Sequence, residues 1–210
     1  MTAVLERRPT RTRFRKRERA LILGVPALWA FVLLFHPTGA AENFYPIIRD
    51  NHARWMFVHS AMVVLIPLFA FALYRLIRGI DNTAARVGRI ALPVFAVFYG
   101  VYEALMGLGT GMFVSSVETL PAAEQALAVE AYKSNTALQT LEYLASLPCG
   151  AALIATAFAL HRASLVGWRS VVAILVATPL ITVHVPPFGP IGLVLVIAAI
   201  VPVLQRPSAS

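Results

Sequence analysis

Three long apolar stretches constrain this chain more than any other feature of its sequence. They are Trp55–Ile77, Ile90–Val114 and Leu138–Leu160, and each carries a single charged residue. A helix needs about 20 apolar residues to cross the hydrocarbon core of a bilayer, because each residue advances it by only ~1.5 Å. The stretches are too long and too uniformly apolar for the strands of a membrane barrel. They predict an integral membrane protein built from helices.

Three shorter apolar stretches, Ala20–Phe35, Trp168–Val185 and Pro190–Leu204, complete the set. Each can span with the help of flanking residues or local thinning of the bilayer. The composition agrees, since only 13% of the residues are charged, whereas about a quarter are charged in a typical soluble domain. We therefore predict an all-α, polytopic bundle of six transmembrane helices.

The basic residues predict the orientation of this bundle. Eight of the eighteen Lys and Arg residues lie in the arm formed by residues 1–19. If the N-terminus is inside, fifteen of the eighteen fall on the inner side, as the positive-inside rule requires. Both termini, including the tail 205–210, are then cytoplasmic. Because the other basic residues are scattered over short loops, we expect the arm to meet anionic lipid and expect no nucleic-acid partner.

Two segments need separate interpretation. Residues 121–134, which follow a proline and are rich in helix formers, predict an outer helix that lies near the membrane interface. The first apolar stretch allows an alternative, because a basic start followed by a short apolar run and small residues near Ala41 is also typical of a cleaved signal peptide. Cleavage would leave five helices and an outer N-terminus.

Ionisable residues inside the predicted spans gather toward the outer side. His59 and Glu142 lie about one turn from the outer ends of their spans, and His184 closes the fifth span at its outer end. Glu103 is placed near the midplane, and His36 ends the first span on the outer side as a candidate entrance residue. An ionisable group within a span normally faces other helices and needs a partner. We expect His59 to meet Glu103, Glu142 or His184.

Helical spacing supports packed polar faces on two spans. Gly107 and Gly111 form a small-xxx-small pair that lets another helix approach closely, so Glu103 is expected to point into a tight interface. Polar residues on the fourth span recur on one face and are expected to meet other helices: Gln139, Glu142, Ser146, Cys149 and Thr156.

Several functions fit this pattern. The chain has one cysteine, Cys149, and no HExxH or GxSxG motif, so the sequence does not favour an enzyme. The interpretation we favour is a membrane accessory or structural subunit, with a protein partner or a second copy, that carries a polar site on its outer side. An alternative is transport of a small solute, a proton or a divalent metal ion through a site of His59, Glu103, Glu142 and His184. A further alternative is one haem bound by His59 and His184.

Four segments of the chain are similar to known sequences. They are "FHPTG", "ARWMFVHSAM", "ALPVFAVFYGVYEALMGLGTG" and "HVPPFGPIG". Together they resemble an uncharacterised family of small actinobacterial membrane proteins with six helices, and the resemblance runs from Ala20 to Leu204. It implies a location in the bacterial plasma membrane, and it implies no activity or cofactor.

Overall fold

The computed structural model describes residues 14–39 and 44–205, and this part of the chain is helical throughout, with no strand. Residues 1–13 of the predicted arm and 206–210 of the predicted tail lie outside these residues, as does the candidate cleavage point near Ala41. Side chains of Asn82 and Asn135 accept hydrogen bonds from backbone amides at the starts of two of the helices. The helices are α1 (Lys16–Leu33), α2 (Phe44–Asp50), α3 (His52–Ile77), α4 (Thr83–Tyr102), a π-helix (Glu103–Gly109), α5 (Thr110–Ser116), a 3₁₀ turn (Val117–Thr119), α6 (Ala122–Lys133), α7 (Thr136–Arg162), α8 (Trp168–Val183) and α9 (Phe188–Gln205).

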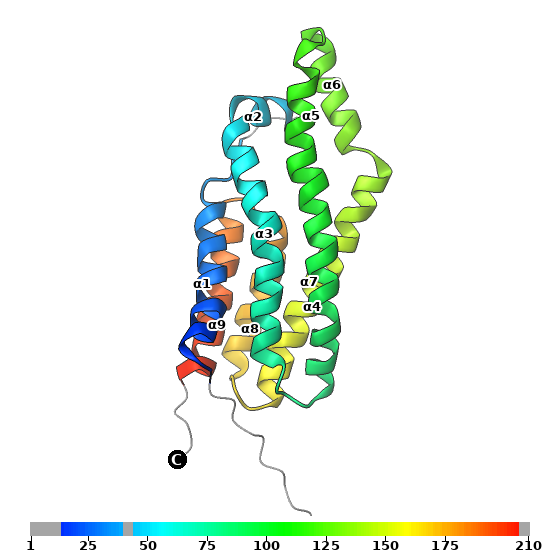
Figure 1. Cartoon of the computed structure of the whole chain (residues 1–210). Helices are drawn as coiled ribbons and strands as arrows, with labels where there is room; N and C mark the ends of the chain where they lie inside the picture. Colours follow the sequence, from blue (N-terminus) through cyan, green and yellow to red (C-terminus); the bar gives the residue numbers. More distant parts are fainter. Residues whose placement is uncertain (1–13, 40–43, 206–210) are drawn as a thin grey trace, which may run out of the picture.

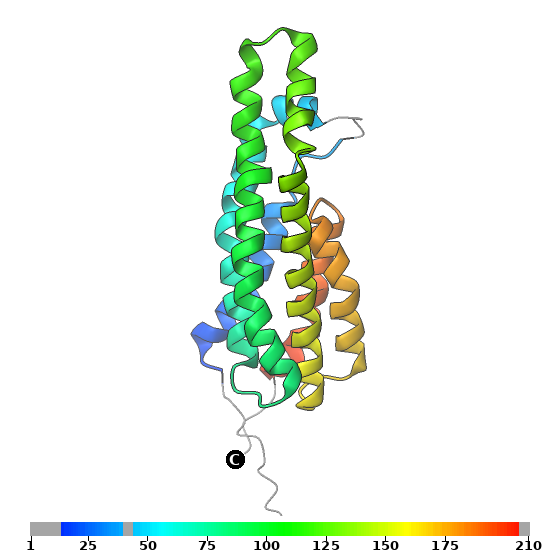
Figure 2. The same ribbon diagram turned by 90° about the vertical axis from the view of Figure 1, so that its right-hand side faces the viewer.

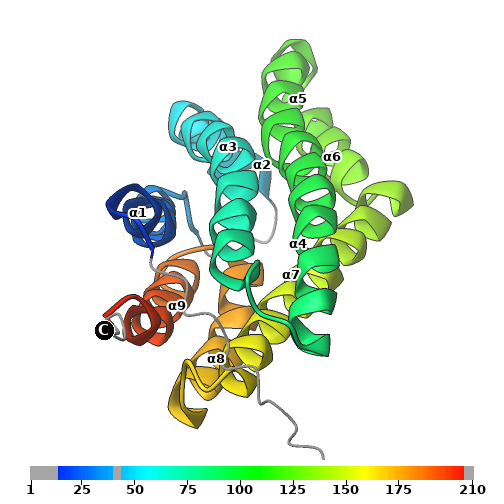
Figure 3. The same ribbon diagram turned by 60° about the horizontal axis from the view of Figure 1, so that its bottom comes forward.

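Six of the described helices form a closed ring (Figure 3). Going around it, α1 packs on α3, α3 on α4, α4 on α7, α7 on α8, α8 on α9, and α9 again on α1. Every member of the ring therefore has two neighbours in the described part of the chain. A closed ring buries one face of each helix and leaves the opposite face outward.

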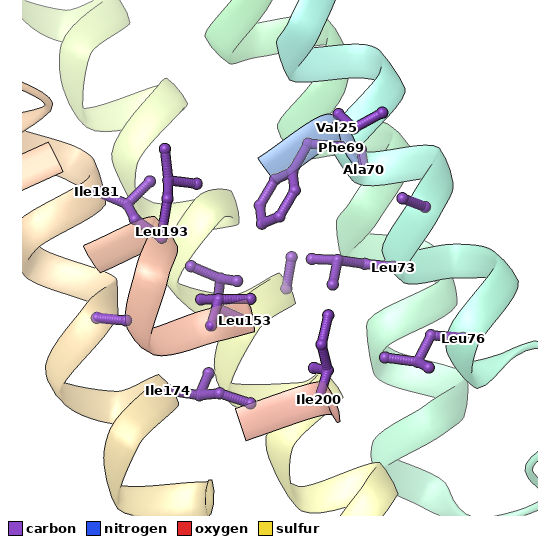
Figure 4. Packing of buried hydrophobic residues seen from close by; sticks show 14 of the residues in the cluster. Val25, Phe69, Ala70, Leu73, Leu76, Leu153, Ile174, Ile181, Leu193 and Ile200 are labelled. Carbon is purple, nitrogen blue, oxygen red and sulfur yellow. The ribbon is translucent and has the colours of Figure 1, made fainter. Parts of the chain in front are cut away.

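Aliphatic and aromatic side chains fill the inside of the ring (Figure 4). Phe69 and Leu73 from α3 belong to one buried cluster with Leu153 from α7, Ile174 from α8 and Ile200 from α9, and all five are almost fully buried. The outward faces are apolar as well, with exposed side chains such as Phe31, Val97, Leu147, Val176 and Ile191. An apolar outer surface of this kind is what a bilayer requires.

The helices coincide with the six predicted apolar stretches to within a few residues, except that the helix over the stretch Ile90–Val114 begins earlier, at Thr83. In the described residues, four helices are long and apolar enough to cross a membrane: His52–Ile77, the continuous rod Thr83–Thr119, Thr136–Arg162 and Phe188–Gln205. Helix α8 is apolar but shorter, and α1 begins with four charged residues, Lys16 to Arg19.

A cap of α2, α5 and α6 extends the molecule beyond one end of the ring (Figure 1). It has its own small core, which includes Tyr45, Val114 and Val129. The segment 121–134, which the sequence predicts to lie near the membrane interface, forms α6, and α6 runs antiparallel to α5 as an upright hairpin (Figure 2). The rings of Phe113 and Tyr132 stack between the two helices with their centres 5.0 Å apart, which fixes this arrangement.

An ion-pair cluster ties α1 to α3 at the opposite end of the ring. The Glu18 carboxylate accepts hydrogen bonds from the Arg15 amide (2.8 Å), from Arg75 and from Arg78 (3.3 Å). The Arg15 amide and then the Arg75 guanidinium lower the pKa of Glu18 below its ordinary value of 4.5. Both stabilise the charged form, so the cluster favours the folded state wherever Glu18 is ionised.

We predict that Glu18→Gln lowers the melting temperature in detergent at pH 7 by about 2–4 °C, the shift that a loss of ~1 kcal/mol produces in a domain of this size. Because the pKa of Glu18 is lowered by folding, the difference from wild type is complete above pH ~4.5 and fades as the pH falls through the folded-state pKa. Asp81→Asn, which removes a fully solvated pair with Arg86, is the control and should change little. Equal melting temperatures for wild type and Glu18→Gln at pH 7 would contradict the prediction.

Candidate functional site

A buried pair of ionisable side chains joins α3 to the π-helix. The Nδ1 atom of His59 lies 2.7 Å from Oε2 of Glu103, and the two residues are only 3% and 1% exposed. A carboxyl group so deeply buried is costly unless it is hydrogen-bonded. The predicted partnership between His59 and Glu103 is therefore confirmed.

Local backbone features bring these two side chains together. Glu103 is the first residue of the π-helix Glu103–Gly109, a widened turn of a kind that often occurs at functional sites. Gly107 lies against the ring of His59, where a Cβ atom would overlap the imidazole, and Gly111 lies equally close to Met56. The predicted close approach at the two glycines is confirmed.

Two more histidines meet this pair from the ends of other helices. His36 follows α1 and is 5% exposed, while His184 ends α8 and is partly buried. The ring centre of His36 is 5.2 Å from that of His59 and 5.4 Å from that of His184, and the last two are 6.2 Å apart. His184 has a left-handed backbone (φ 46°), a conformation that is strained for a residue with a side chain. We call His36, His59, His184 and Glu103 the outer cluster, after the outer side on which the sequence predicts these residues to lie.

The hydrogen bonds of the three rings point to one tautomer. Nδ1 of His36 faces the carbonyl of Pro37 (2.8 Å), and Nδ1 of His184 faces that of Thr182 (3.2 Å). A carbonyl can only accept, so each Nδ1 donates, and the Nε2 of a neutral ring then carries a lone pair. Nδ1 of His59 donates to Glu103 when that carboxyl group is ionised. In the described residues, Nε2 of His36, Nε2 of His59 and Oε1 of Glu103 are buried without a hydrogen-bond partner.

Aromatic residues fix the frame of the outer cluster. The ring of Trp55 lies 4.3 Å from that of His59 and 5.3 Å from that of His36, and its indole N–H donates to the carbonyl of Gly107 (2.7 Å). The Tyr99 hydroxyl donates to the carbonyl of Thr182 (3.3 Å), which links the helix of Glu103 to that of His184. The sequence analysis did not single out Trp55, although its spacing of four residues from His59 places both on one helix face.

The outer cluster differs from the predicted site in membership. Glu103, which is expected near the midplane, pairs with His59, and the ring of His59 packs against those of His36 and His184 just past the ends of α1 and α8. The cluster therefore lies at one end of the ring, and Glu103 lies about 30 Å from the start of the rod Thr83–Thr119. His36, expected only at the entrance, is a full member.

Glu142 was predicted to belong to the site, and it stays outside the outer cluster. It is exposed on the first turns of α7, where that helix leans away from the ring (Figures 1 and 3). The prediction that the polar residues of α7 meet other helices is therefore only partly correct. Gln139 is exposed too, whereas Cys149 and Thr156 are buried against neighbouring helices as expected.

Two predicted ligands can be compared with this geometry. Among the described residues, no group of three or more His, Cys, Asp or Glu side chains is already placed to hold a metal ion. For haem, the obstacle is His36, whose ring lies between 5 and 6 Å from both candidate axial ligands, His59 and His184. A porphyrin between those two rings would need the space that His36 fills, so the arrangement argues against haem.

No protein-family model, curated protein or solved structure matches the chain. The outer cluster is therefore interpreted from its own geometry.

We predict that Gly107→Ala destabilises the protein by roughly 1–3 kcal/mol, because the added methyl group overlaps the ring of His59. The matched control is Gly100→Ala in α4, where a Cβ atom meets nothing within 4 Å. It should be neutral, or stabilising by up to ~1 kcal/mol through helix propensity. Thermal unfolding in mild detergent measures both, and similar melting temperatures for the two variants would contradict the close contact.

Proposed function

We propose that this chain is a multi-pass membrane accessory protein with six spans that binds a small cation, either a proton or a divalent metal ion, at its outer end without conducting it. The observation that supports this best is the buried His59–Glu103 pair with unpartnered polar atoms beside it. Polar groups that served only to hold helices together would satisfy one another.

The ring supports the proposal of six spans. Helices α1 and α8 are shorter than the other members, yet each packs between two helices that include a long apolar one. Their outward side chains, among them Phe31 and Val176, are exposed and apolar like those of their neighbours. All six therefore require the same apolar surroundings. With the basic residues inside, both termini are cytoplasmic, and the resemblance noted above supports the bacterial plasma membrane.

The packed interior favours binding over transport. In the described residues the buried polar and charged side chains are His36, His59, Glu103, Thr110 and Thr156, and of these only Thr156 lies toward the cytoplasmic end. Between the outer cluster and that end the ring is filled by residues such as Phe69, Leu73 and Ile200. A cation crossing the ring would meet hydrocarbon instead of a chain of polar groups.

The orientation gives a direct prediction. On a Cys149→Ala background, Glu124→Cys in α6 should react with a membrane-impermeant maleimide on intact cells. Asp81→Cys, in the loop between α3 and α4, should react only after the membrane is permeabilised. Both sites are exposed carboxylates, so they form a matched pair. The reverse pattern would overturn the orientation, and labelling of both sites in intact cells would overturn the number of spans.

Flux measurements test whether the site is one-sided. Proteoliposomes that contain a pH-sensitive dye or a zinc indicator are given a proton or Zn²⁺ gradient. We expect the rate with wild-type protein to equal that of protein-free liposomes and that of a His59→Ala, Glu103→Gln double variant. A faster wild-type rate that the double variant loses would show transport and overturn the proposed function.

A further inference from the structure

We infer that the outer cluster is a three-histidine site for a transition-metal ion such as Zn²⁺ or Cu²⁺, with His36, His59 and His184 as its ligands and Glu103 as the residue that positions His59. This inference deepens the proposed function and rests on it. It also changes the predicted ligand set, because His36 enters as a ligand, Glu103 moves behind His59, and Glu142 is left out.

The separation of the three rings matches a shared ion. Imidazole nitrogens bind zinc at about 2.0–2.1 Å, which puts the centres of rings that share one ion roughly 5–6 Å apart. The three ring centres here are 5.2, 5.4 and 6.2 Å apart. The donor atoms are not yet gathered around one point. Binding must therefore turn the rings, whose centres already lie close to the required spacing.

The hydrogen bonds behind the rings support the same ligand set. In protein metal sites a ligating histidine usually donates its second ring N–H to a carbonyl or a carboxylate, which fixes the tautomer. All three rings do so through Nδ1, toward Pro37, Glu103 and Thr182. This leaves Nε2 of each ring as the candidate ligand atom, and for His36 and His59 that atom is buried without a partner.

The chemistry of the donors selects the class of ion. Neutral imidazole nitrogens suit Zn²⁺, Cu²⁺ and related ions, whereas Mg²⁺ and Ca²⁺ require oxygen ligands. Three histidines also leave a fourth coordination position, which a water molecule or a small ligand can take from the outer side. Glu103 supplies a negative charge directly behind one ligand, which raises the basicity of His59 and strengthens its bond to the ion.

The experiment measures Zn²⁺ binding by calorimetry and elemental analysis on the full-length protein in mild detergent. We expect one Zn²⁺ per chain for wild type, together with a higher melting temperature in the presence of Zn²⁺, since an ion that binds only the folded state stabilises it. His36→Ala and His184→Ala should each lose the stoichiometric binding and the thermal shift. His161→Ala, at the cytoplasmic end beside Trp168, is the matched histidine control and should bind as wild type does.

Glu103→Gln separates positioning from ligation. Stoichiometry should be retained while the affinity for Zn²⁺ falls by about 10–100-fold, the usual effect of losing such a supporting partner. With Co²⁺ in place of Zn²⁺, the visible absorption bands of this variant should shift in wavelength. They should keep their intensity, because the same three nitrogens bind. If Glu103→Gln abolishes binding and the Co²⁺ bands disappear, Glu103 is a ligand and the assignment is wrong.

Two results would overturn the three-histidine site itself. One is wild-type protein that binds no stoichiometric Zn²⁺, Cu²⁺ or Co²⁺, and the other is His36→Ala protein that is monodisperse, unfolds cooperatively and binds Zn²⁺ as wild type does. The proposed function is overturned by a different observation, which is flux across proteoliposomes that depends on the wild-type site. Neither of the two binding results involves such flux. The two proposals therefore fail in separate experiments.

Discussion

The hydrogen bond between His59 and Glu103 is the interaction on which this end of the bundle depends. Burying a carboxyl group inside a membrane bundle costs several kcal/mol unless a partner meets it. That partner is on α3, so α3 must approach the rod that carries Glu103 very closely. Gly107 and Gly111 permit the approach, and the π-helix turns Glu103 toward α3. The small residues and the irregular turn are therefore consequences of one buried pair.

Differences in helix length decide where this pair lies. Helices α1 and α8 end near the outer cluster, whereas α3 and the rod Thr83–Thr119 continue beyond it. The step between short and long helices leaves His36 and His184 at free helix ends, where their rings can turn toward α3. The cap of α2, α5 and α6 is built on the longer helices above this step (Figure 1). A site at such a step lies at one end of the ring.

The sequence predicts the helices and part of the site, for physical reasons that differ. Apolar stretches identify spans because bilayer thickness sets a minimum length, and the cost of a buried carboxyl group identifies Glu103 as a residue that needs a partner. Periodicity cannot show that a helix leans away from its bundle, so it placed Glu142 inside. It also cannot show where a helix begins relative to its apolar stretch, so it does not give the position of Glu103 along the rod. The position of His36 depends on the ends of α1 and α8 meeting α3, and that is a tertiary property.

The choice between structural polar contacts and a binding site depends on which atoms are satisfied. Thr110 and Thr178 show the structural case, since each hydroxyl donates to a carbonyl in the preceding turn of its own helix. The outer cluster differs, because every ring uses Nδ1 for a hydrogen bond, and among the described residues Nε2 of His36 and Nε2 of His59 are buried without a partner. Leaving buried acceptors unpartnered costs about 1–3 kcal/mol each. Two such atoms on neighbouring rings are costly to keep without a ligand, and a bound cation would satisfy both.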